Sequence, residues 1–99
     1  MRITLVRELE PMLPITIHSK GKGRFPDKSK KYIVVSYPIE MHGVWTCTVA
    51  PEDDPTAVET IRLEKYGIET VKSNPLYWIE TSQNSKTIND EEKSDGKDS

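Results

Sequence analysis

The stretch YIVVSYPIEMHGVWTCTVA, residues 32–50, joins two runs of β-branched and aromatic residues through a turn sequence. The first run is apolar on both faces, which is typical of a central strand. The second run alternates and places Trp45, Cys47 and Val49 on one face. Gly43 can adopt the positive φ that a tight turn requires. The stretch therefore predicts a β-hairpin within a sheet.

Shorter runs on both sides of this hairpin alternate between apolar and polar residues, which is strand periodicity. Proline residues and a Ser-Asn-Pro sequence separate them and predict breaks and turns. These predicted strands are RITLV (2–6), ITIHS (15–19), IETVK (68–72) and LYWIE (76–80).

The segment between Pro55 and Gly67 carries helix signals. Acidic residues precede the proline, and TAVE (56–59) has the pattern of a capping box. Gly67 would supply the left-handed end of the helix. The sequence therefore predicts one short helix with a buried stripe formed by Val58, Ile61, Leu63 and Tyr66.

These elements predict an α+β fold, a small and mainly antiparallel sheet with one helix packed on it. A parallel crossover from strand 44–50 through the helix to strand 68–72 is equally allowed. We expect a single domain over residues 1–80. Residues 81–99 have one apolar side chain, Ile88, and five acids against three lysines, so we expect a disordered tail.

The composition predicts that the chain associates with itself. Only 34% of the 99 residues are hydrophobic, and the single Cys47 cannot form an intrachain disulfide. Because such a small core needs support, we expect a homodimer, with strand exchange near the proline-broken EPMLP segment as one option. Candidate interface residues are Trp45, Tyr77 and Trp78.

No pattern of residues predicts catalysis, a cofactor or a metal site. His18, His42 and Cys47 match no zinc-binding spacing, and a lone cysteine is usually a small core residue. The consecutive acids 52–54 fit an exposed helix start better than acid–base chemistry. No apolar run reaches the roughly 20 residues that span a bilayer, and no leader pattern is found. We therefore expect a non-enzymatic, soluble, intracellular protein.

One loop between two predicted strands is strongly basic. Six basic side chains against one acid give it a net charge of +5. Its glycines allow close approach to phosphates, and Phe25 could stack on bases. A lysine-rich, solvated hairpin tip that prevents aggregation is the alternative explanation. The candidate nucleic-acid contacts are Lys20, Lys22, Arg24, Phe25, Lys28, Lys30 and Lys31.

The N-terminal stretch MRITLVRELEPMLPITIHSKGKGRFPDKSKKYIVVSY, the single cysteine and the charged tail resemble small orphan proteins of filamentous viruses that infect hyperthermophilic archaea. The resemblance rests on size and composition and transfers no site residue. It implies an intracellular viral protein of unassigned role that is oligomeric and stable to heat.

Two functional hypotheses follow. The first is a homodimeric interaction protein that presents its loops and tail to a protein partner. The second is a small, nonspecific nucleic-acid-binding protein that uses the basic loop 20–31.

Overall fold

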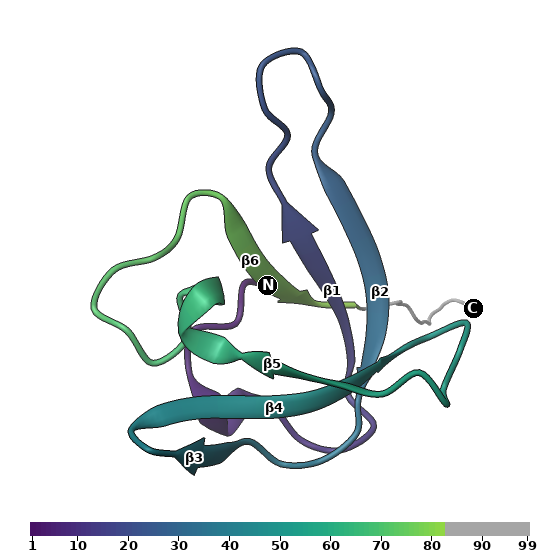
Figure 1. Cartoon of the computed structure of the whole chain (residues 1–99), viewed down its shortest axis with the longest axis vertical. Coiled ribbons are helices and arrows are strands. Elements are labelled where there is room, and N and C mark those ends of the chain that lie inside the picture. Colours follow the sequence, from purple (N-terminus) through teal and green to yellow (C-terminus); the bar gives the residue numbers. More distant parts are fainter. Residues whose placement is uncertain (83–99) are drawn as a thin grey trace, which may run out of the picture.

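The computed structural model describes residues 1–82, which form six antiparallel strands and two short 3-10 helices (Figure 1). The 3-10 helices are η1 (Val6–Glu8) and η2 (Leu63–Tyr66). The strands are β1 (Pro14–Ser19), β2 (Lys28–Val34), β3 (Ile39–Met41), β4 (Val44–Pro51), β5 (Glu59–Arg62) and β6 (Tyr77–Thr81).

The strands form one strongly bent sheet. β6 pairs with β1, β1 pairs with β2, and β2 pairs with the C-terminal part of β4. β3 continues along the same edge of β4 as β2, and β5 pairs with the opposite edge. The N-terminal segment extends the other end of the sheet, because the Ile3 amide donates to the Ile79 carbonyl at 2.8 Å. Within residues 1–82, η2 connects β5 to the segment that leads back to β6.

The predicted helix between Pro55 and Gly67 is wrong, and with it the α+β class. Residues 59–62 form β5, and a single 3-10 turn follows. An alternation of buried and exposed side chains explains why this segment is a strand. Ile61 and Leu63 are buried, while the residues between and around them are exposed. Val58, expected in the buried stripe, is 55% exposed. Gly67 is left-handed at φ 72°, but it ends the 3-10 turn rather than an α-helix.

Two of the predicted strands are also wrong. The segment 2–6 contributes an isolated bridge between Arg2 and Glu80 and then turns into η1. The segment 68–72 forms turns, and Val71 is fully exposed. A parallel crossover onto that segment is therefore excluded, and every strand pair within residues 1–82 is antiparallel.

The predicted hairpin of residues 32–50 is confirmed only in part: the turn lies before β4, but the first strand of the hairpin is β3, which falls within the segment expected to be the turn. His42 and Gly43 form this turn at φ 54° and 80°. The first predicted run is divided, because β2 ends at Val34 and the chain bends before β3 begins. This bend lets β2 and β3 share β4 as a neighbour.

The core lies on the concave face of the bent sheet. Side chains from every strand except β3 meet there, and Ile15, Val34, Val49, Leu63 and Ile79 have no exposed surface. Ile3 and Leu9 from the N-terminal segment close one side of the cluster. In the described chain, β1 lies between β2 and β6 and pairs with both.

The β1–β2 hairpin extends well beyond the core (Figure 1). Its last strand pair joins Ser19 to Lys28, and residues 20–27 form the tip. At the other end, the Ser82 amide still donates to the Pro14 carbonyl at 2.9 Å. Most of the predicted tail, residues 83–99, lies outside the described residues. No helix in the described part of the chain is long and apolar enough to cross a membrane.

Candidate functional site

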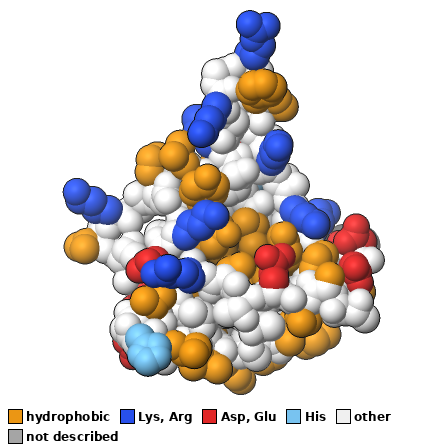
Figure 2. Space-filling model, viewed as in Figure 1, with side chains coloured by type: hydrophobic (Ala, Val, Ile, Leu, Met, Phe, Trp, Pro, Cys, Tyr) orange, Lys and Arg blue, Asp and Glu red, His pale blue; other side chains and the backbone are white. Residues whose placement is uncertain are grey.

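A cleft of about 740 Å³ opens where the projecting hairpin leaves the core. Strands β1, β2 and β6 form one side of the cleft, and η2 forms the other. Figure 2 shows basic and hydrophobic side chains gathered over this region and along the hairpin. The lining residues are Ile17, His18, Ser19, Asp27, Lys28, Ser29, Lys30, Tyr32, Lys65, Tyr66 and Tyr77.

Three tyrosines supply the aromatic part of the cleft. Tyr66 and Tyr77 meet edge to face, with ring centres 6.4 Å apart and planes at 82°. Such a contact is a favourable aromatic geometry and holds both rings in place. Tyr32 lies on β2 and, like Tyr77, is partly exposed and packs against the core. The core thus fixes the three rings, and those of Tyr32 and Tyr77 remain partly accessible from the cleft.

Three lysines, Lys28, Lys30 and Lys65, line the cleft with these rings. Lys65 Nζ lies 4.5 Å from the centre of the Tyr77 ring and 5.7 Å from that of Tyr66. Lys30 Nζ lies 5.6 Å from the centre of the Tyr32 ring. These distances fall within the range of cation–π attraction. The ammonium groups are exposed and form no ion pair within residues 1–82, so they can contact an anion.

Strand register explains why these side chains share one face. In an antiparallel sheet, residues directly opposite each other point to the same side, as do residues two apart on one strand. Val34 on β2 is fully buried in the core. Tyr32, Lys30 and Lys28 precede it at every second position, so their side chains lie on the same face of the sheet, each farther from the core than the last. Tyr77 occupies the same face, because it pairs with Ser19, which pairs with Lys28.

Tyr32 and Tyr66 contribute no negative charge at neutral pH. Burial raises the pKa of Tyr66, and nearby Tyr32, Glu59 and Tyr77 raise it further. Burial also raises the pKa of Tyr32, together with the charge and hydrogen bonding of Glu59. Both phenols therefore stay protonated and remain hydrogen-bond donors.

A second hollow of about 390 Å³ continues the cleft toward the hairpin tip. It shares Ser19, Lys28 and Tyr77 with the first and adds Lys20, Gly21, Lys22, Phe25 and Pro26. Phe25 is 72% exposed. The tip is folded tightly, because a Cβ at Gly21 would overlap the carbonyl groups of Phe25 and Pro26. The Gly21 amide also donates to Asp27 Oδ1 at 2.9 Å.

Most of the basic-loop residues predicted from the sequence line these two hollows. Lys20, Lys22, Phe25, Lys28 and Lys30 do so. Lys31 and Arg24 do not. Lys31 pairs with Thr16 on the opposite face of the hairpin, and Arg24 lies exposed at the tip.

The three predicted interface residues do not form one patch. Trp45 and Tyr77 both pack against the core, and Tyr77 also lines the cleft. Trp78, the next residue on β6, takes part in a separate cluster of side chains. It stacks on His18, with ring centres 5.0 Å apart and planes at 10°, and the Arg2 guanidinium lies 5.7 Å from its ring centre.

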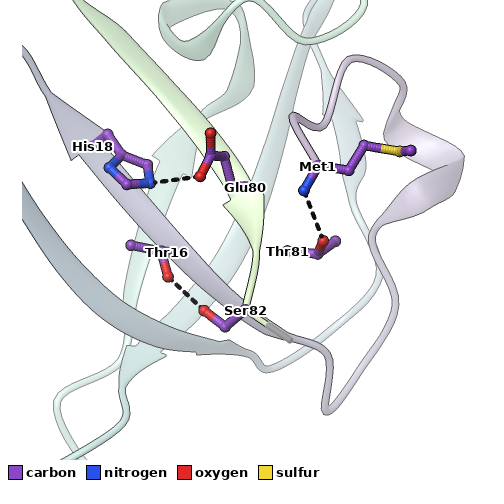
Figure 3. Close-up of polar contacts among 6 residues, drawn as sticks. All are labelled: Met1, Thr16, His18, Glu80, Thr81 and Ser82. Atoms are coloured by element: carbon purple, nitrogen blue, oxygen red, sulfur yellow. Dashed lines mark hydrogen bonds and ion pairs between the residues drawn. The ribbon is translucent and has the colours of Figure 1, made fainter. Parts of the chain in front are cut away.

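This outer cluster continues into polar contacts along β1 and β6 (Figure 3). His18 Nε2 lies 3.1 Å from Glu80 Oε1, and the hydroxyl groups of Thr16 and Ser82 are hydrogen-bonded. The N-terminal ammonium donates to Thr81 Oγ1 at 3.5 Å. These contacts pair neighbouring strands with one another, so we assign them a structural role.

The cysteine and the histidine considered for chemistry in the sequence lie in different parts of the fold. Cys47 is buried, and burial raises the pKa of its thiol to about 11, so it is a poor nucleophile at neutral pH. His42 lies in the β3–β4 turn. Among residues 1–82, no group of three or more His, Cys, Asp or Glu side chains is placed to hold a metal.

Sequence reasoning missed Tyr32, Lys65 and Tyr66 as site residues and placed Tyr77 in an interface. One signal was present, because the run Lys28-Ser-Lys30-Lys-Tyr32 alternates. Period 2 places Lys28, Lys30 and Tyr32 on one face of a strand and Lys31 on the other. No local pattern joins this face to Lys65 and Tyr66, which lie more than 30 residues away in the sequence.

Comparisons of this chain with protein-family models, with curated proteins and with solved structures find no match. The function must therefore be argued from the cleft itself.

Proposed function

We propose that the protein binds single-stranded nucleic acid in the cleft between the β1–β2 hairpin and η2. The observation that carries this proposal is the placement of three tyrosines among three lysines in one groove, with Phe25 and further lysines along its continuation. Proteins that hold single strands combine a positively charged groove for the backbone with aromatic rings on which bases stack.

The aromatic rings favour a single strand over a duplex. In a duplex, base faces are occupied by neighbouring bases, so Tyr32 and Tyr77 would have nothing to stack on. The bases of a single strand can unstack and present their faces to these rings. The lysines then neutralise phosphates on both sides of the stacked bases.

Charge distribution also supports the proposal. Residues 1–82 contain 11 Lys and Arg and 11 Asp and Glu side chains, so this part of the chain is neutral overall. Six of the basic residues lie between Lys20 and Lys31, with Asp27 as the only acid among them. A local basic surface on a neutral domain attracts phosphates to that one site.

Fluorescence anisotropy with a labelled octathymidylate, dT8, tests the proposal. The test variant is Lys28→Ala/Lys30→Ala/Lys65→Ala, and the matched control is Arg7→Ala/Lys31→Ala/Lys72→Ala, which removes the same charge outside the cleft. We expect the test variant to lose about tenfold or more in affinity and the control to change little. Absence of binding by the parent, or equal losses in both variants, would contradict the proposal.

A second candidate function is self-association, as the composition suggested. The observation that favours it is a row of exposed apolar side chains at every second position along the bend and β3. Val35, Tyr37, Ile39 and Met41 are 43%, 65%, 58% and 54% exposed. Light scattering on the parent and on Tyr37→Ser/Ile39→Ser tests it, since a dimer held by this row would dissociate in the variant.

A further inference from the structure

Glu59 is an acidic side chain at the edge of the basic cleft. It begins β5 and pairs with Val49, which pairs with the fully buried Val34. Because opposed residues share a face, Glu59 lies on the same face as Tyr32. It also lines a shallow hollow with Lys65 and Tyr66, next to the cleft. Figure 2 shows acidic atoms beside the hydrophobic patch at the foot of the hairpin.

The carboxylate of Glu59 lies close to two of the cleft tyrosines. Its charge contributes to the raised pKa of both Tyr32 and Tyr66, the two rings at this end of the cleft. Within residues 1–82 it forms no ion pair. A carboxylate offers about four acceptor positions, so both of its oxygens can accept hydrogen bonds from a ligand.

An acid at this position weakens the attraction of the cleft for phosphate. It can instead accept hydrogen bonds from a base that is stacked on the neighbouring rings. Guanine is the base that presents two adjacent donors, N1–H and the N2 amino group, on its pairing edge. Adenine and cytosine present one amino group beside a ring acceptor, and thymine and uracil present one N–H between two carbonyl oxygens, which a carboxylate repels.

We propose that Glu59 makes the cleft prefer guanine at the base that stacks on Tyr32, beside Tyr66. This inference rests on the proposed binding of single strands and adds a base preference to it. The geometry is a two-point contact, in which the two carboxylate oxygens accept from N1–H and from the N2 amino group of guanine. Two-point contacts of this kind discriminate strongly between bases.

Anisotropy titrations of dT8 derivatives with one central dG, dA, dC or deoxyinosine test the inference. Inosine keeps N1–H but lacks the N2 amino group. We expect the parent to bind the dG oligonucleotide about fivefold more tightly than the dA and dC ones. Inosine should lose more than half of that preference.

The variant Glu59→Gln separates base recognition from charge. It should bind dT8 more tightly than the parent, because a repulsive charge is removed, yet show no preference for dG. Glu40→Gln, which removes an exposed charge on β3, is the matched control and should keep the preference. Thermal melting confirms that both variants fold.

Three outcomes would overturn the inference, and they are distinguishable. If dT8 and its dG derivative bind the parent equally, the guanine preference fails while the proposed function stands. If the preference persists in Glu59→Gln, another residue reads the base. If no oligonucleotide binds, both the inference and the proposed function fail.

Discussion

Lys65 Nζ lies 4.5 Å from the centre of the Tyr77 ring and joins two segments that are 12 positions apart in sequence. Lys65 belongs to η2, whereas Tyr77 begins β6. The contact brings the turn after β5 against the base of the projecting hairpin, and this placement gives the cleft its second side. Residues on both sides should therefore contribute to ligand binding.

Tyr77 is the most direct test of base stacking. Tyr77→Ala should weaken binding of dT8 by roughly fivefold or more, since one base–aromatic stack contributes about 1–3 kcal/mol. Tyr77→Phe keeps the ring and should bind nearly as well as the parent. Tyr37→Ala, at an exposed tyrosine on the bend before β3, is the control. Equal affinity of the Tyr77→Ala variant and the parent would exclude this ring as a platform.

The salt dependence of binding should separate the cleft from the hairpin tip. Each phosphate contacted in a single strand adds about −0.7 to the log–log slope of affinity against salt. Replacing Lys28, Lys30 and Lys65 with alanine should flatten the slope by about two units. Replacing Lys20, Lys22 and Arg24 should flatten it by about 1.4 units, because only the two lysines line the tip hollow. An unchanged slope in both variants would show that phosphates are not contacted there.

Two glycines with positive φ allow a matched stability test. Gly67→Ala and Gly43→Ala both force alanine into the left-handed region, at φ 72° and 80°, which costs about 1–2 kcal/mol. Only at Gly67 would the new Cβ also crowd its surroundings, since it would lie 3.1 Å from the Asn74 nitrogen and 3.2 Å from the Ser73 Cα. Urea unfolding should therefore show the larger loss of stability for Gly67→Ala. A larger loss of stability for Gly43→Ala would mean that residues 73–74 shift easily to make room for the new Cβ.

The buried thiol predicts how stability changes at high pH. Burial raises the pKa of Cys47 from its usual 9.0 to about 11, so the unfolded chain releases the thiol proton before the folded one does. This contribution to stability is fully present below about pH 9 and is lost as the pH rises toward 11. Across that interval the parent should lose up to about 2 kcal/mol more than Cys47→Ala in urea unfolding. Parallel pH profiles for the two proteins would contradict the pKa shift.

Three strands were predictable from the sequence, because each has a clear local alternation of apolar and polar residues. Residues 15–19, 44–50 and 76–80 fall within β1, β4 and β6 or within one residue of them. The turn at His42 and Gly43 was also predictable, since glycine marks it. The helix prediction is wrong because the capping signals at Thr56 and Glu59 compete with the strand alternation of Ile61 and Leu63. The pairing of β5 with β4 then decided the conformation.

The cleft was predictable only in part. The basic loop identified Lys28 and Lys30, but the site also depends on which face of β2 meets η2. That depends on the strand pairing Val34–Val49–Glu59, which combines three separate segments. Tyr66 looked like a core residue in the sequence, and it is indeed buried while lining the cleft. Its second role follows from tertiary packing alone.

The pairing of both ends of the described chain has a consequence for folding. Ile3 donates to Ile79, and β1 pairs with β6 across about 60 residues of sequence. The local pairs β3–β4 and β1–β2 can form while the chain is still being synthesised, but the sheet is incomplete until β6 emerges. Because such long-range pairing slows folding, we expect a slow final phase in refolding experiments. Until β6 docks, the open edge of β1 can pair with other chains. Crowding by other chains should therefore favour aggregation at this step more than at any earlier one.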